Sequence, residues 1–238
     1  MNPTSLLFWW PKVKDLGIPV PRTEIWDTGD GLKSWFYAME GGRQPGDLFF
    51  LEEAEQIARL IGYPLFLRTD LASGKHGWKE TCYVQDESLL PGHIFRVLEE
   101  NEMAGIVVSL DYRALVFREM LSLFAPFTAF RGDLPIARER RYFIREGKVQ
   151  CHHPYWIEGA VAGGRPEADG WAETLAMLNI EYENEIEILS RYSEKVAEVL
   201  GGYWSIDYAF AADGTWFLID VAEGEKSWHP ECPDRTRQ

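Results

Sequence analysis

The chain has 238 residues, which suits one large α+β domain or two smaller lobes with an ordered core. Its formal net charge of −14 argues against a protein that wraps a nucleic-acid backbone, because such proteins need clustered Lys and Arg. Cys82, Cys151 and Cys232 lack disulfide or zinc spacing, and no apolar run suits a signal peptide or a membrane span, so we expect a cytoplasmic protein with no membrane role.

The first third of the chain is predicted to contain one helix and one strand. Residues 1–26 are punctuated by proline and are expected to form an extended lead-in. Apolar residues recur at helical spacing over 51–61, and Gly62 ends that pattern. Residues 64–70 follow as a short buried strand that runs into a glycine-bearing loop at 73–77. A strand that leads into a glycine loop favours phosphate binding.

Arg68 and Lys75 are the candidate phosphate ligands of this strand and loop. Backbone N–H groups, a guanidinium and an ammonium can converge there on anionic oxygens. The loop matches neither the P-loop spacing nor the dinucleotide-binding glycine pattern, so both of those folds are rejected. A surface lysine and an arginine in an ordinary salt bridge remain the alternative.

The middle of the chain is predicted to alternate between helix and strand. A helix is expected over 92–102 and a strand over 114–121. Residues 140–155 form a predicted hairpin that turns at residues 146–147. We expect one apolar face, made of Tyr142, Ile144, Val149 and Cys151, and a second face made of Arg141, Phe143, Lys148, Gln150 and His152.

Glu139 and Arg141 are a candidate catalytic pair at the start of this hairpin. They lie two residues apart on a strand and therefore share a face. An acid and a guanidinium could thus project over the same pocket. An ordinary surface ion pair is the alternative.

The last third combines a glycine-rich link at 159–170, a long acidic helix at 183–200 and a hairpin at 204–221. If the hairpin turn is centred at residues 213–214, Asp207 lies directly opposite Asp220. The same register predicts one apolar face made of Trp204, Ile206, Tyr208, Phe210, Phe217, Ile219 and Val221.

Asp207 and Asp220 are the candidate metal ligands. Carboxylates directly opposite have Cβ atoms about 4.5–5.5 Å apart and repel each other unless one is protonated or a cation lies between them. Mg²⁺ suits this pair, because it takes one or two protein carboxylates and completes its shell with water and phosphate. The alternative is a pair of edge residues facing water, one of them paired with a nearby Arg or Lys. The histidines and cysteines lack transition-metal spacing.

Taken in chain order, these segments resemble the ATP-grasp superfamily, and in pattern most closely its cell division cycle protein 123-like branch. The resemblance covers most of the chain. It rests on residues 66–68 with Lys75, 116–121, 139–144, 206–207 and 219–220.

The resemblance implies an α+β fold with two lobes whose mostly antiparallel sheets clasp a nucleotide. Residues 1–112 would form the N-terminal lobe with the phosphate-contacting strand and loop. Residues 113–238 would form the C-terminal ATP-grasp lobe with the metal-binding hairpin. ATP and Mg²⁺ are the implied cofactors.

The resemblance also implies roles for individual residues. Arg68 and Lys75 would contact the phosphates, and the adenine-binding hinge would consist of Glu119, Met120 and Leu121. Asp207 and Asp220 would be the magnesium ligands, in agreement with the register.

Ala222 departs from the pattern of the resembled family. The family's metal strand usually reads acid, apolar residue, Asn, whereas here Asp220 and Val221 are followed by Ala222. Glu223 or Glu225 could take the place of the missing amide oxygen. Without a replacement, the second metal position and phosphoryl transfer are weakened, which favours a protein that only binds ATP.

The leading hypothesis is an ATP-dependent carboxylate–amine ligase that acts through an acyl-phosphate. Arg141 would steady the acyl-phosphate oxygens, with Glu139 and Lys75 as further catalytic residues. The carboxylate or amine acceptor is undefined and could be a protein. One alternative is an ATP-binding assembly factor that clamps a protein partner, as in the cell division cycle protein 123-like branch; a third is a small-molecule phosphotransferase.

Overall fold

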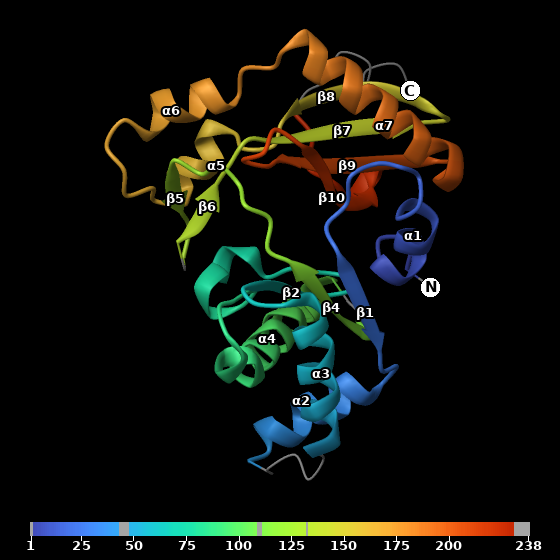
Figure 1. The fold of residues 1–238 in the computed structure, drawn as a ribbon, viewed down its shortest axis with the longest axis vertical. Helices are drawn as coiled ribbons and strands as arrows, with labels where there is room; N and C mark the ends of the chain where they lie inside the picture. The colour runs from blue at the N-terminus through green and yellow to red at the C-terminus, as the bar shows by residue number, and fades with distance from the viewer. Residues whose placement is uncertain (1, 43–47, 109–110, 132, 231–238) are drawn as a thin grey trace. The chain divides into compact units, whose positions relative to one another are not determined.

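The computed structural model describes residues 2–42, 48–108, 111–131 and 133–230 (Figure 1). None of the helices in these ranges is long and apolar enough to cross a membrane. The chain is organised into two compact units, and each is described by itself.

Neither unit is a single stretch of sequence. Unit 1 consists of Met1–Val20, Ser122–Ala129 and Pro135–Gln238. Unit 2 consists of Pro21–Leu121 and Phe130–Leu134. The predicted division into functional lobes after residue 112 stays a prediction.

Unit 2 contains a four-stranded antiparallel sheet in the order β1-β4-β2-β3. Its strands are β1 (Thr23–Asp27), β2 (Leu65–Thr69), β3 (Tyr83–Val84) and β4 (Ala114–Glu119). Its helices are α2 (Gly31–Glu40), α3 (Leu48–Ile61) and α4 (Leu90–Val108), with the short 3-10 helices η1 (Lys75–Glu80) and η2 (Glu87–Leu89).

The hydrophobic core of unit 2 lies between these three α-helices and one face of the sheet (Figure 1). Leu65 and Leu67 of β2 and Phe117 of β4 are fully buried in it. Because side chains alternate along a strand, Arg68 and Arg118 lie on the opposite face of the sheet. The helices therefore leave that second face to polar side chains.

Most elements of unit 2 follow the sequence pattern. The helix predicted over 51–61 and the strand predicted over 64–70 are confirmed as α3 and β2. The other predicted helix lies inside the longer α4, and the strand expected at 114–121 is β4, which ends at Glu119. The extended lead-in is wrong in two places, since it contains β1 and the helix α1 (Leu6–Val13). β1 pairs with β4, a partner so distant in sequence that no local pattern indicates it.

Unit 1 contains a four-stranded antiparallel sheet in the order β10-β9-β7-β8. Its strands are β7 (Glu139–Arg145), β8 (Lys148–Pro154), β9 (Tyr203–Phe210) and β10 (Trp216–Glu223). Its helices are α1, α5 (Glu158–Gly163), α6 (Trp171–Leu178), α7 (Glu183–Leu200) and the 3-10 helix η3 (Gly224–Lys226). A separate two-stranded sheet is formed by β5 (Phe127–Ala129) and β6 (Leu134–Ile136).

The long helix α7 covers one face of the four-stranded sheet of unit 1 (Figure 1). Ser193 of α7 lies 3.1 Å, hydroxyl to hydroxyl, from Tyr208 of β9, and Arg140 of β7 contacts Glu185 of α7. Alternation along β7 and β9 then places Arg141 and Asp207 on the opposite face. We call that opposite face the site face.

The hairpin β7–β8 has the predicted turn but a different register. Glu146 and Gly147 both have positive φ, of 48° and 79°, as a two-residue hairpin turn requires. A bulge between Phe143 and Ile144 then shifts the pairing, so that Cys151 lies opposite Phe143. The predicted grouping of Cys151 with Tyr142 is therefore wrong, and His152 takes the position opposite Tyr142.

The hairpin β9–β10 keeps the predicted pair of aspartates although its turn is longer than predicted. The backbone N–H of Ala211 donates to the carbonyl of Thr215 at 2.9 Å, which closes a three-residue loop and shifts the pairing by one. A bulge between Leu218 and Asp220 reverses the shift, so Asp207 does lie opposite Asp220. The predicted apolar face is wrong in this stretch. Leu218 and Trp216 are buried in place of Ile219 and Phe217.

Candidate functional site

Four side chains form one row across the site face. Arg141 of β7 lies opposite His153 of β8 on one side and opposite Asp207 of β9 on the other. Asp207 in turn lies opposite Asp220 of β10. The row thus brings a guanidinium and two carboxylates together on adjacent strands.

Arg141 holds Asp207 in a bidentate ion pair. Nε donates to Oδ1 and Nη2 donates to Oδ2, each at 2.7 Å. The side chains are only 15% and 10% exposed, so water screens the pair weakly. Burial by itself would lower the pKa of Arg141, but the charge and hydrogen bonds of Asp207 outweigh it and raise that pKa. The Tyr155 ring lies 4.7 Å from the guanidinium and keeps it in place.

Asp220 completes the predicted carboxylate pair. Its Oδ1 accepts a hydrogen bond from the backbone N–H of Val221 at 3.1 Å, and its charge also contributes to the raised pKa of Arg141. Ala222, the next residue on this face, supplies no ligand oxygen. In the described part of the chain no group of three or more His, Cys, Asp or Glu could hold a metal ion. Two carboxylates still fit Mg²⁺, whose remaining ligands are water and phosphate oxygens.

Glu223 is placed away from this pair. Alternation along β10 puts Glu223 on the face opposite to Asp220. Its carboxylate forms an ion pair with Lys226, and its Oε2 accepts a hydrogen bond from Thr4 at 3.4 Å. The structure therefore brings Asp207 and Asp220 together but does not bring Glu223 to them.

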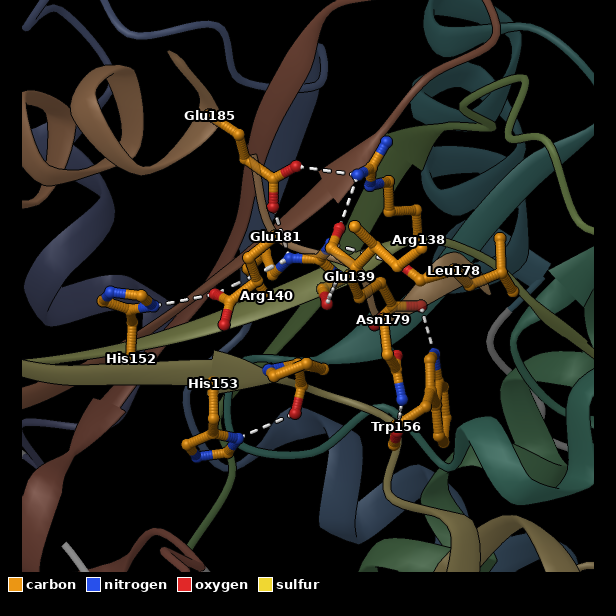
Figure 2. A network of polar contacts seen from close by, with 12 residues as sticks. Arg138, Glu139, Arg140, His152, His153, Trp156, Leu178, Asn179, Glu181 and Glu185 are labelled. Carbon is orange, nitrogen blue, oxygen red and sulfur yellow. Dashed lines mark hydrogen bonds and ion pairs between the residues drawn. The ribbon is translucent and has the colours of Figure 1, made fainter. Parts of the chain in front are cut away.

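Glu139 is buried at the start of β7 and contacts a tryptophan. The indole N–H of Trp156 donates to Oε1 of Glu139 at 3.0 Å, as Figure 2 shows. The carbonyl of Trp156 accepts a hydrogen bond from the Asn179 side chain at 2.8 Å. The carboxylate of Glu139 thus helps to position the segment after β8, and the guanidinium of Arg141 pairs with Asp207 instead.

Arg140, on the α7 side of the same strand, is the centre of a buried polar network (Figure 2). Its Nε forms an ion pair with Glu185 of α7, which also pairs with Nη2 of Arg138 at 3.0 Å. Nη2 of Arg140 donates to the carbonyls of Leu178 and Ile180 at 3.1 and 2.8 Å. The network holds β7, and with it Arg141, in a fixed position against α7.

In unit 2, two buried arginines share the face of the sheet that the helices leave open. Arg68 of β2 and Arg118 of β4 are each 4% exposed. They are diagonal neighbours, because Phe66 pairs with Arg118 and Arg68 pairs with Val116. Nε of Arg68 donates to the carbonyl of Thr69 at 3.1 Å. Two guanidinium groups on one face favour an anion. The sequence reasoning missed Arg118, although an arginine within an otherwise apolar strand could have identified it.

The glycine loop of unit 2 packs tightly on Glu100 of α4. A Cβ at Gly74 would lie 2.4 Å from Oε2 of Glu100, and one at Gly77 would lie 2.8 Å from Oε1. Gly74 also has a φ of +58°, which favours glycine. Lys75 begins η1 within this loop and is partly exposed. The loop therefore fixes the backbone on either side of Lys75.

The predicted hinge residues follow directly on β4. Both oxygens of Glu119 accept hydrogen bonds from Arg22, from its backbone N–H at 2.8 Å and from its Nε at 3.1 Å. Met120 and Leu121 are partly exposed and lie beyond the end of the strand. The side chain of Glu119 is thus tied to the segment that precedes β1.

Residues 59–237 match the model of an ATP-grasp domain family, the third family of its clade. The chain belongs to this family. The match confirms the predicted ATP-grasp resemblance and the α+β fold of helices and antiparallel sheets. ATP binding is the shared property of ATP-grasp domains, and the aspartate pair and the arginine face belong to such a domain here.

Solved structures with the fold of this ATP-grasp protein include C-terminally truncated Cdc123 from Schizosaccharomyces pombe. Its TM-score is 0.55 at 11% identity, over 92% of this chain and 83% of that chain. N5-carboxyaminoimidazole synthase from Aspergillus clavatus, in complex with ADP and 5-aminoimidazole ribonucleotide, gives 0.50 at 10% identity, over 92% and 44%. The ATP-grasp ligase PsnB complexed with minimal precursor gives 0.46 at 13% identity, over 92% and 52%.

This ATP-grasp chain thus spans about half the length of PsnB, and 58% of a RimK domain protein from Sphaerobacter thermophilus. At these identities the shared feature is the fold. No curated protein sequence matches the chain.

Proposed function

We propose that this protein binds ATP together with Mg²⁺ and acts as an ATP-dependent carboxylate–amine ligase through an acyl-phosphate. The observation that carries the proposal is the row of Arg141, Asp207 and Asp220 on one sheet face of an ATP-grasp domain. ATP-grasp proteins are generally ATP-dependent ligases, so the family supports the reaction class. The nature of the acceptor is left to experiment.

Asp207 and Asp220 would hold the magnesium ion. When bound, Mg²⁺ neutralises phosphate charge and orients the phosphoryl group for transfer. Two facing carboxylates on adjacent strands supply the donors that this ion prefers. Asp207 would share its charge between the ion and Arg141, which already occupies both of its oxygens.

Unit 2 would supply the groups that bind the rest of the nucleotide. Arg68 and Arg118 would bind phosphate oxygens through guanidinium N–H groups, and Lys75 would add an ammonium from the glycine loop. Burial of both arginines on one face supports this assignment, since neighbouring guanidinium groups away from bulk water concentrate positive charge there. Glu119, Met120 and Leu121 would form the adenine hinge, with Glu119 fixed by Arg22.

Arg141 and Glu139 would act on the reacting groups from β7. In a ligase the acceptor carboxylate attacks the γ-phosphorus, ADP leaves, and an amine then displaces phosphate from the acyl-phosphate. A fixed guanidinium stabilises the charge that develops on the acyl-phosphate oxygens. Glu139 is held by Trp156 and would position the neighbouring segment during these steps.

A second function, that of an ATP-binding assembly factor, is favoured by Ala222. The missing side-chain oxygen on the site face leaves two carboxylates among the described residues, where catalysis with two metal ions needs more ligands. The fold similarity to Cdc123 covers 83% of that chain, which is consistent with this alternative. ATP would then be retained to order the protein for a partner.

Calorimetric titration with ATP, with and without Mg²⁺, tests the binding half of the proposal. We expect Mg²⁺ to strengthen ATP binding, and Asp207→Asn and Asp220→Asn to abolish that dependence. Asp213→Asn is the matched control, because Asp213 is an exposed residue in the loop of the same hairpin. Absence of ATP binding by the wild type under both conditions would overturn the proposal.

Hydroxylamine trapping tests the chemical half. A ligase that forms an acyl-phosphate yields a hydroxamate and ADP when it is given a carboxylate pool, ATP, Mg²⁺ and hydroxylamine. A phosphotransferase releases ADP without hydroxamate, and an assembly factor binds ATP without either product. Each outcome therefore selects one of the three hypotheses.

A further inference from the structure

A cysteine and a histidine meet on the site face, in a row next to that of Arg141. Cys151 of β8 lies opposite Phe143, and its Sγ lies 2.8 Å from Nε2 of His229. His229 comes from the segment that follows β10, and its ring lies 4.0 Å, centroid to centroid, from that of Phe143. The contact joins two residues that are 78 positions apart in the sequence.

The surroundings of His229 determine which of its nitrogens can accept a proton. Its Nδ1 contacts the carbonyl of Pro230. A carbonyl only accepts hydrogen bonds, so Nδ1 carries the proton. Nε2 is then the basic nitrogen, and it faces the thiol. This tautomer is the one that can remove the proton of Cys151.

The charged and titratable groups around this dyad are few among the described residues. His153 lies two residues along β8, with its ring centroid 6.0 Å from that of His229. Arg141 and Asp207 of the next two strands form an ion pair, so together they add little net charge. Within this part of the chain, a thiolate at Cys151 would have the His229 imidazolium as its nearest positive partner.

Cys82 provides an internal contrast. It is fully buried in unit 2, and its Sγ contacts the carbonyl of Trp78 at 3.9 Å. Burial raises the pKa of its thiol to about 12, which keeps it protonated and inert. Cys151 is partly exposed and is therefore accessible to small reagents.

We propose that Cys151 and His229 form a thiolate–imidazolium dyad, and that Cys151 is a modification site for low-molecular-weight disulfides. The thiol proton moves from Sγ to Nε2 of His229. The thiolate attacks one sulfur of the disulfide, the S–S bond breaks and the other sulfur leaves as a thiolate that takes up a proton. The product is a mixed disulfide on the site face. This inference stands on the geometry of unit 1 and does not depend on the proposed ligase activity.

Alkylation by iodoacetamide as a function of pH tests the dyad. The experiment uses the full chain with Cys232→Ser, and peptide mass spectrometry follows Cys151 and Cys82 separately. For an ordinary thiol the rate rises up to a pKa of about 8.5. We expect the inflection for Cys151 at least about one unit lower, and a rate at pH 6.5 about tenfold above that of His229→Gln. Cys82 should react only after unfolding.

Two further measurements keep the proposal open to refutation. Oxidised glutathione should add to Cys151 faster in the parent chain than in His229→Gln at pH 6.5. His153→Gln is the matched histidine control and should leave the inflection unchanged. Equal profiles for the parent and His229→Gln, with near-ultraviolet circular dichroism showing both folded, would overturn the proposal. An inflection that moves only in His153→Gln would also overturn it.

Discussion

Arg141 and Asp207 face each other across β7 and β9 and share two hydrogen bonds of 2.7 Å in a mostly buried environment. The same carboxylate lies opposite Asp220. Asp207 is therefore in contact with a fixed positive charge and adjacent to a second negative one. The guanidinium offsets the repulsion between the carboxylates, so the pair can be present together at neutral pH.

Removal of the guanidinium should destabilise the fold. Arg141→Met leaves Asp207 buried beside Asp220 without its partner, and breaking a buried pair in this way costs about 3–5 kcal/mol. The double variant Arg141→Met with Asp207→Leu should recover much of that loss, because no unpaired charge remains. Urea unfolding of the wild type, both single variants and the double variant measures the coupling. Single losses below about 1 kcal/mol that simply add would contradict the prediction.

Restoring an amide oxygen at position 222 should strengthen metal binding. Ala222 follows Asp220 on the site face, so Ala222→Asn would add a third oxygen ligand next to the carboxylate pair. We expect the affinity for Mg²⁺ with ATP to rise about tenfold, which corresponds to about 1.4 kcal/mol. Calorimetric titration compares it with Ala212→Asn, an identical change at an exposed loop residue. A weaker affinity in Ala222→Asn would mean that the ion does not bind at this pair.

The buried network around Arg140 should contribute strongly to stability. Glu185→Gln removes the charge that faces the fully buried guanidinium of Arg140, with an expected loss of about 3–5 kcal/mol. Glu187→Gln, at an exposed position on the same helix, should change stability by less than about 0.5 kcal/mol. Thermal and urea unfolding provide the comparison. Equal effects of the two changes would show that Arg140 is satisfied by the carbonyls of Leu178 and Ile180 alone.

The pairing of Asp207 with Asp220 can be predicted because it depends on local information. A turn signal and the alternation of one hairpin are enough, although the bulge before Asp220 compensates for an error of one residue at the turn. The bulge itself cannot be predicted, since it depends on which side chain, Leu218 or Ile219, packs better against the core of unit 1.

The partners of the site residues cannot be predicted, because they come from distant parts of the sequence. Spacing alone offers Glu139 as an ion-pair partner for Arg141, whereas the structure pairs Arg141 with Asp207, 66 positions away. In the same way Glu119 contacts Arg22 through the pairing of β1 with β4. Composition and periodicity identify which residues are polar within a strand, and only the strand order shows which of them meet.

The glycine loop of unit 2 should tolerate no side chain at Gly77. In Gly77→Ala the new Cβ would lie 2.8 Å from Oε1 of Glu100 and 2.9 Å from Cγ2 of Thr81, so the loop that carries Lys75 must move. We expect both lower stability and weaker ATP binding. Gly92→Ala is the control, because a Cβ there meets nothing within 4 Å and alanine favours the helix α4 by about 1 kcal/mol. Unchanged nucleotide affinity in Gly77→Ala would separate the loop from the phosphate site.

Glu100, beneath that loop, should make stability depend on pH. Burial, followed by smaller effects of neighbouring charges, raises the pKa of Glu100 above its ordinary value of 4.5. The folded chain therefore keeps this proton to higher pH than the unfolded chain does, and stability falls as the pH rises from about 4.5 through the raised pKa. Glu100→Gln removes this penalty, so its advantage over the wild type should grow across that window and then stay constant. Urea unfolding between about pH 4 and pH 8 measures the difference, with exposed Glu53→Gln as the baseline for the same chemical change. Parallel curves for the wild type and Glu100→Gln would show that the loop does not desolvate this carboxylate.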